Sequence, residues 1–94
     1  MILDQQFAEV WSRRALSIPI RRLLTIGVVA ATGSVDTLQM QFRRCLDVGE
    51  LTVEQVREAA IHLITYVGTP AAGGILAASE AAITTYLELQ SRET

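Results

Sequence analysis

The stretch "TVEQVREAAIHLITYVGTP", residues 52–70, predicts one complete helix with signals at both ends. Thr52 stands three residues before Gln55, the spacing of a capping box in which each residue bonds the other's backbone amide. Gly68 ends the helix, and Thr69 with Pro70 is typical of a new helix start. The apolar residues recur at helical spacing and form one buried stripe: Val56, Ala59, Ala60, Leu63 and Val67.

The same helical period continues through the rest of the chain, with no segment that alternates as a strand would. We expect a short first helix marked by apolar residues, a second from about Ile20 to Thr32 and a third from about Val35 to Val48. Pro19 disfavours helical geometry at Ile18, and Gly49 is placed for the left-handed conformation after a helix. The apolar markers of the first helix are Ile2, Phe7, Val10 and Trp11.

The last predicted helix runs from Thr69 to about Gln90 and contains two glycines near its start. Gly73 and Gly74 each cost about 1 kcal/mol of helix propensity. Such a cost indicates close backbone packing or a ligand. The fold class is therefore all-α, with five helices in one domain over residues 1–94.

Composition restricts the partners of this chain. Half of the 94 residues are hydrophobic, an excess that in a small domain favours burial between subunits, so we expect a homo-oligomer. A net charge of −2 without basic clusters argues against nucleic acid binding. All eight basic residues are arginine, which suits bidentate pairing with carboxylates, although biased codon usage is the stronger explanation of the composition.

One cysteine and one histidine exclude an internal disulfide framework and a Cys/His zinc site, so we expect no metal and a reducing compartment. Arg21 and Arg22 before an apolar run imitate an export signal. The residues that follow are patterned as helices that need this segment for their core, and the run is too short to span a bilayer. We therefore expect a cytoplasmic protein that does not insert into membranes.

Candidate catalytic residues lie on the helix quoted first. Glu58, His62 and Tyr66 are spaced four residues apart and share one face. A glutamate one turn before a histidine can pair with it, raise its pKa and orient its ring, as in a tuned general acid or base. The alternative is an ordinary solvated helix face.

The only cysteine offers a second candidate. Cys45 follows Gln41 by one turn and stands beside Arg44, whose charge would lower the pKa of an exposed thiol. Free cysteines are more often buried as small apolar residues, and that interpretation is the stronger one for Cys45.

Two ordered blocks of the sequence resemble the carboxymuconolactone decarboxylase family, and together they cover nearly the whole chain. The first is "FAEVWSRRALSIPIRRLLTI" (7–26), and the second is "QFRRCLDVGELTVEQVREAAIHLITYVGTPAA" (41–72), which has one extra residue near Glu50. The matching residues are Glu9, Trp11, Arg13, Leu16, Arg21, Leu23 and Thr25 in the first block, and Arg43, Leu46, Gly49, Thr52, Glu58, Tyr66, Gly68, Pro70 and Ala71 in the second.

The resemblance implies an all-α fold of the alkylhydroperoxidase D-like kind, assembled into trimers or hexamers with active sites near subunit boundaries. Members of the family remove carbon dioxide from a carboxylated muconolactone, without a cofactor. In the peroxidase branch two redox cysteines would stand at Ser34 and Thr37, so disulfide-based peroxide reduction is not expected here. The shared histidine of the family falls at Gln41.

The resemblance also implies roles for individual residues. Arg13 and Arg21, beside Trp11, are candidates to hold a substrate carboxylate, since a guanidinium binds carboxylates in a bidentate manner. Gln41 cannot donate a proton near neutral pH, but its amide can stabilise an oxyanion. His62, oriented by Glu58 and close to Tyr66, or else Glu9, would then supply the proton.

Three functions remain open at this level. The chain is a decarboxylase-like lyase, or an isomerase or cyclase, on a small carboxylated or enolisable substrate. Alternatively it is a non-catalytic small-molecule-binding protein, or a structural oligomeric subunit with the same fold. The resemblance also implies extra helices before the first block in relatives that act on muconolactone; because only ten residues precede Trp11 here, we expect a less complete enclosure of the substrate.

Overall fold

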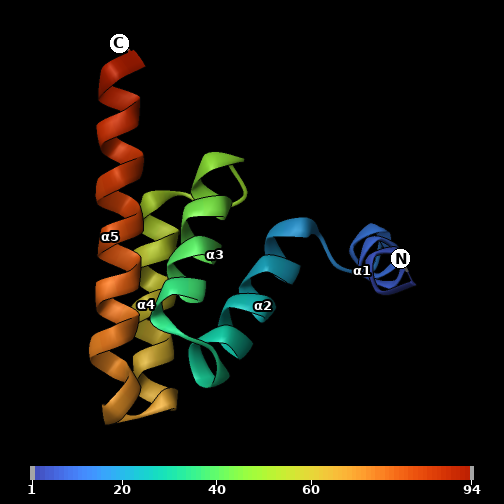
Figure 1. Ribbon diagram of the computed structural model, residues 1–94, viewed down its shortest axis with the longest axis horizontal. Coiled ribbons are helices and arrows are strands. Elements are labelled where there is room, and N and C mark those ends of the chain that lie inside the picture. Colours follow the sequence, from blue (N-terminus) through green and yellow to red (C-terminus); the bar gives the residue numbers. More distant parts are fainter. Residues whose placement is uncertain (1, 94) are drawn as a thin grey trace.

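A computed structural model describes residues 2–93, with side chains described from Gln6 onward, and this part of the chain consists of five α-helices and their connections. Figure 1 shows a bundle of helices with an oblique helix at its side and the N-terminal helix lying apart. The all-α fold expected from the sequence is confirmed. The helices are α1 (Ile2–Ser12), α2 (Ile18–Thr32), α3 (Val35–Asp47), α4 (Val53–Val67) and α5 (Thr69–Glu93).

The helix starts are fixed by side-chain caps. In α4 the Thr52 amide donates to Gln55 Oε1 at 2.9 Å and the Gln55 amide donates to Thr52 Oγ1 at 3.1 Å, which confirms the capping box. The start of α2 was predicted wrongly, because the helix begins at Ile18 and not at Ile20. Pro19 lies in the first turn, where its missing amide costs nothing, and the Ser17 hydroxyl caps the helix.

Two glycines end helices in backbone conformations that other residues rarely adopt. Gly49 has φ +75° after α3, as expected, and Gly68 has φ +97° after α4. The third helix ends one residue earlier than predicted, and the fifth continues to Glu93 instead of stopping near Gln90. Its last turns hold no proline or glycine that would stop it.

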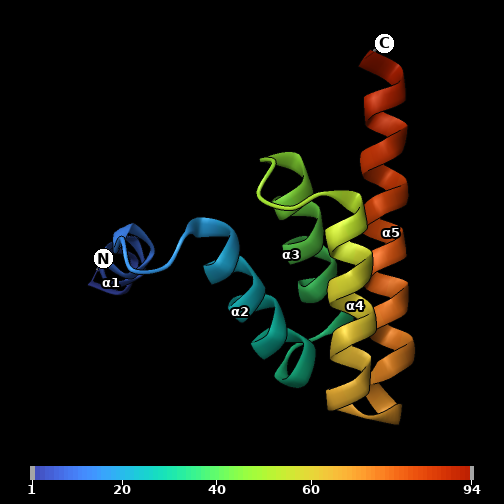
Figure 2. The ribbon, with the colours of Figure 1, turned by 180° about the vertical axis from the view of Figure 1, so that it is seen from behind.

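The core lies among α3, α4 and α5, and α2 packs across α3 and α4 (Figures 1 and 2). Phe42 of α3 and Val56 of α4 are fully buried there, with Ile75 and Ile83 of α5 at 1% exposure. Of the stripe predicted for α4, Val56 and Ala60 are buried in the core and Leu63 and Val67 are partly buried against it, whereas Ala59 lines a groove. In both views α1 stands apart from the bundle and is joined to it through α2.

The two glycines inside α5 have different surroundings. A Cβ on Gly74 would lie 2.9 Å from Val35 Cγ2, whereas a Cβ on Gly73 would meet nothing within 4 Å. Close packing of α5 against the start of α3 thus explains Gly74, as the sequence suggested, but it does not explain Gly73.

This difference yields a first prediction. Gly73→Ala should stabilise the protein by about 0.5–1 kcal/mol, since alanine favours the helix and finds open space. Gly74→Ala has the same gain in helix propensity but also clashes with Val35, and overpacking costs about 1–3 kcal/mol. The two variants should therefore differ by at least about 1 kcal/mol in free energy of unfolding. Urea denaturation of both variants measures the difference, and equal stabilities would contradict the packing described at Gly74.

Within residues 2–93, no helix has the length and apolar character needed to cross a bilayer.

Candidate functional site

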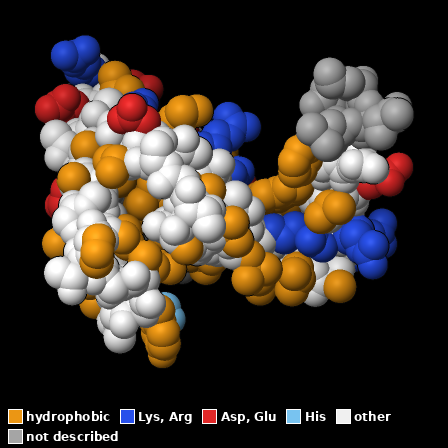
Figure 3. Space-filling view, turned by 60° about the horizontal axis from the view of Figure 1, so that its bottom comes forward, with side chains coloured by type: hydrophobic (Ala, Val, Ile, Leu, Met, Phe, Trp, Pro, Cys, Tyr) orange, Lys and Arg blue, Asp and Glu red, His pale blue; other side chains and the backbone are white. Residues whose placement is uncertain are grey.

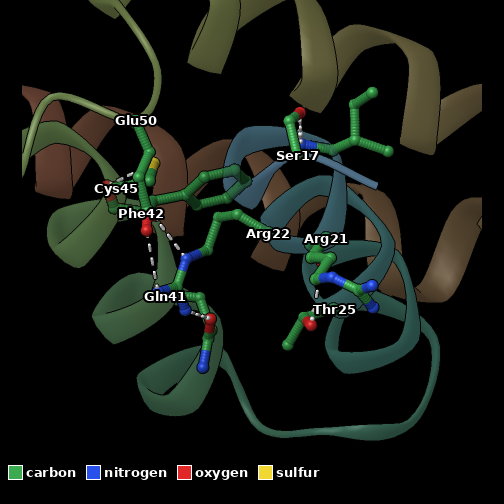
Figure 4. Close-up of polar contacts among 9 residues, drawn as sticks. Ser17, Arg21, Arg22, Thr25, Gln41, Phe42, Cys45 and Glu50 are labelled. Atoms are coloured by element: carbon green, nitrogen blue, oxygen red, sulfur yellow. Dashed lines mark hydrogen bonds and ion pairs between the residues drawn. The ribbon is translucent and has the colours of Figure 1, made fainter. Parts of the chain in front are cut away.

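Arg22 of α2 is the centre of a polar cluster between α2, α3 and the turn before α4 (Figure 4). Its Nε donates to Glu50 Oε1 at 2.7 Å and its Nη2 donates to Glu50 Oε2 at 3.3 Å. Its Nη1 donates to Gln41 Oε1 at 2.7 Å. The Arg22 and Glu50 side chains are only 14% and 12% exposed, so this bidentate pair is shielded from solvent.

The turn between α3 and α4 places the carboxylate of this pair. Gly49 reverses the chain with its positive φ, after which the amides of Glu50 and Leu51 both donate to the Cys45 carbonyl. The Glu50 side chain then reaches back across the end of α3 to Arg22. The cluster therefore depends on a backbone conformation that favours glycine.

An aromatic ring covers one face of the guanidinium. Arg22 Cζ lies 4.8 Å from the centroid of the Trp11 ring, a cation–π contact. The Nε, Nη1 and Nη2 atoms of Arg22 donate to Glu50 and Gln41, and the Trp11 ring covers one face of the guanidinium. Because a guanidinium stays protonated in proteins, Arg22 fixes α2 to the bundle and does not serve as an acid.

Cys45 lies beneath this cluster and is fully buried, which confirms the packing interpretation. Its Sγ donates to the Phe42 carbonyl at 3.0 Å. The pKa of the Cys45 thiol is raised from 9.0 to about 11, mainly by burial and to a smaller extent by the Glu50 carboxylate, while the Arg22 guanidinium opposes the shift. The thiol is therefore unreactive at neutral pH.

A second prediction follows from this thiol. At pH 8 a thiol-specific disulfide reagent should modify native protein at least about a hundredfold more slowly than urea-unfolded protein, since a two-unit rise in pKa removes that fraction of thiolate. The contribution of this thiol to the free energy of unfolding should be constant below pH 9. It should fall as pH rises from 9 toward 11, because in that range only the folded state still holds the thiol proton. Equal modification rates would contradict the burial.

The arginines expected to hold a substrate carboxylate lie at the corner between α1 and α2. Arg21 Nη2 donates to the Arg13 carbonyl at 3.1 Å. Arg21 Nε is buried and, within the described part of the chain, has no hydrogen-bond partner. The Arg13 side chain is exposed, as is Glu9 on α1. A shallow cavity of about 190 Å³ adjoins this corner, lined by Val10, Trp11, Arg21, Leu24 and Thr25.

A larger groove of about 410 Å³ separates α2 from α4. Its walls are mainly apolar, and its polar groups all come from α4. Leu23 follows Arg22 and Leu51 follows Glu50, so the groove borders the polar cluster. The lining residues are Leu23, Ile26, Leu51, Gln55, Glu58, Ala59, His62 and Leu63.

His62 and Glu58 lie on the exposed edge of this groove, and Tyr66 continues the line beyond it. The His62 and Tyr66 rings are tilted by 43° with centroids 5.0 Å apart. Among the described side chains no hydrogen bond or ion pair joins Glu58 to His62, so the structure does not show the expected pairing. His62 is therefore free to meet a molecule in the groove.

The predicted site residues thus fall into three places and do not form one constellation within a single chain. Gln41 lies in the polar cluster. The second group lies at the α1–α2 corner, and the third on the groove face of α4. The second group is Glu9, Trp11, Arg13 and Arg21, and the third is Glu58, His62 and Tyr66.

Sequence reasoning missed the two central residues of the polar cluster, Arg22 and Glu50. The arginine-only composition suited a bidentate pair, and this is where one is found. No local spacing indicates it, because the two residues are 28 positions apart. Within residues 2–93, no three His, Cys, Asp or Glu side chains are grouped as metal ligands.

Comparison with known proteins identifies the family of this chain. The 4-carboxymuconolactone decarboxylase of Acinetobacter baylyi is 36% identical over 74 residues. The match covers 79% of this chain and 54% of that protein, so the chain spans about half the length of its relative. No solved structure gives a significant match. The model of the carboxymuconolactone decarboxylase family matches residues 1–81, and the chain therefore belongs to this family.

Proposed function

We propose that the protein is a decarboxylase-like lyase, or an isomerase or cyclase of related chemistry, acting on a small carboxylated or enolisable substrate in the groove between α2 and α4. The observation that carries the proposal is the groove itself. Its volume of about 410 Å³ is in the range of small-molecule sites, its walls are apolar, and a histidine stands at its edge.

The chemistry needs a proton donor. When a carboxylate leaves as carbon dioxide, the electron pair of the broken carbon–carbon bond remains on the substrate as an enolate. A protonated His62 would transfer its Nε2 or Nδ1 proton to that carbon and become neutral. Glu58 lines the same groove one turn earlier on α4.

Gln41 takes no part in the chemistry of this groove. Its Oε1 accepts from Arg22 in the polar cluster, and its side chain does not line the groove. It does not replace the family's histidine as an acid. His62 is the only imidazole in the chain, so acid–base catalysis by histidine has to pass through it.

A specific observation favours the second candidate, a non-catalytic binding protein or structural subunit. The position of the family's histidine is occupied by Gln41, which is bonded to an arginine held by Glu50. In that case the cluster would serve folding alone, and the groove would bind a ligand or another helix without turnover.

Carbon dioxide release from a carboxylated muconolactone, measured alongside calorimetric binding of the same compound, tests the proposal. Release above the spontaneous rate supports the lyase. Binding of the compound with neither carbon dioxide release nor conversion to an isomer seen by NMR would favour the binding protein. Absence of both binding and turnover would leave the structural role.

A further inference from the structure

The N-terminal part of the chain presents an unusual amount of apolar surface. Among residues 6–93, half of the exposed large hydrophobic side chains lie between Phe7 and Val28. Phe7 and Val10, three positions apart on one face of α1, are 58% and 48% exposed. Figure 3 shows hydrophobic side chains running from the body of the molecule onto this part of the chain.

The α1 helix is held away from its own bundle. The Trp11 ring packs on Arg22 at 4.8 Å, and Arg21 bonds the Arg13 carbonyl, so the end of α1 and the residue that follows it are tied to α2. Figures 1 and 2 show that α1 lies apart from α3, α4 and α5. A fixed helix with an exposed apolar face is suited to pack on another molecule.

The groove between α2 and α4 matches this helix in length and character. An 11-residue helix is about 16 Å long, and the groove-lining stretch from Leu51 to Leu63 extends about 18 Å. Both surfaces are apolar along their centre: Phe7 and Val10 on the helix, and Leu23 with Ala59 in the groove.

Charge at the edges of the two surfaces is also complementary. Arg13 and Arg14 follow α1, their side chains are exposed, and within the described side chains neither forms an ion pair. Glu58 lines the groove on α4, and Glu54 lies one turn earlier on the same helix; both are likewise exposed without an ion pair. The basic residues after α1 are thus complementary in charge to this acidic stretch of α4.

From these features we infer that α1 of a second copy of the chain lies over the open side of the groove between α2 and α4 and leaves the space beneath it for a ligand. It covers the apolar walls and brings Arg13 and Arg14 of that copy to the edge that holds Glu58 and His62. The groove has no arginine of its own, so the second copy completes the site for a carboxylate. The docking of α1 does not depend on the proposed function, whereas the role of the arginines in binding substrate rests on it.

Disulfide trapping tests the docking directly. Two differently tagged chains, one with Val10→Cys and one with Leu23→Cys, are co-expressed and oxidised, and we expect a disulfide-linked heterodimer. The matched control replaces Leu23→Cys with Leu87→Cys, a leucine of α5 that is 48% exposed and should not cross-link. The native Cys45 is buried and does not compete.

Three results of this experiment would overturn the inference. One is equal cross-linking of Val10→Cys with either leucine position. Another is trapping of Val10→Cys only with itself, which would mean that two α1 helices pack together. The third is a monomeric internal disulfide in a Val10→Cys/Leu23→Cys double variant, since α1 would then cover its own groove.

Subunit complementation tests the sharing of the site. His62→Gln and Arg13→Gln/Arg14→Gln chains are each expected to be inactive alone. Co-expressed, they should recover about a quarter of the wild-type rate, the share of random groove–arm pairs in which both are intact. No recovery despite cross-linking would overturn the shared site. If the wild type turns over no substrate, the proposed function fails, while the cross-link still decides the docking.

Discussion

Replacing Glu50 with alanine should lower the free energy of unfolding by about 3 kcal/mol, at the low end for a buried ion pair that loses one partner. The variant leaves the Arg22 guanidinium, only 14% exposed, with Gln41 and the Trp11 ring as its remaining neighbours. The charge has lost its counter-ion but stays largely shielded from water. For a domain of this size the melting temperature should fall by roughly 12 °C or more.

The matched control is Glu80→Ala. Glu80 also pairs with an arginine, Arg57, at 3.3 Å, but these two side chains are 52% and 53% exposed. An exposed pair contributes at most about 1 kcal/mol, so this variant should remain close to the wild type. Thermal and urea denaturation give both values. Equal losses in Glu50→Ala and Glu80→Ala would show that the Arg22 cluster does not hold the fold.

Replacing His62 with glutamine should reduce kcat by about 10²- to 10⁴-fold if the proposed lyase chemistry is correct, because the variant keeps a polar side chain but loses the transferable proton. His62 is exposed at the edge of the groove, so its replacement should leave the melting temperature within about 2 °C of the wild type. Initial rates of carbon dioxide release measure the effect.

The neighbouring tyrosine provides the control for His62. Tyr66→Phe keeps the ring that stacks on His62 at 5.0 Å and removes only the hydroxyl, so its rate should change by less than about tenfold. A His62→Gln variant with the wild-type rate would exclude His62 as the acid.

The elements of the fold could be predicted because their signals are local. Two such signals are the capping box at Thr52 and Gln55 and the turn at Gly49. Each depends on a few neighbouring residues, and both were confirmed. The start of α2 was the exception. The rule that proline disfavours helix before it was applied to Ile18, whereas Ser17 as the cap makes Pro19 a first-turn residue.

The candidate site was harder to predict, since it depends on which helices meet. Gln41 and His62 were expected to act together, but one lies beside Arg22 and the other on the groove face of α4. Helical spacing shows which residues share a face of one helix, and not which face of another helix it meets. The Arg22–Glu50 pair lay outside such reasoning for the same reason.

That ion pair has a consequence for motion within the molecule. Among the described contacts, α2 meets the bundle through a limited apolar strip and one shielded charge pair, while α1 is attached only beyond it. Regions with few buried contacts open locally at lower free-energy cost than the whole domain. We therefore expect residues 2–32 to open before the rest of the chain. Their amides should exchange with deuterium before those of α3, α4 and α5, and Glu50 sets how often they open.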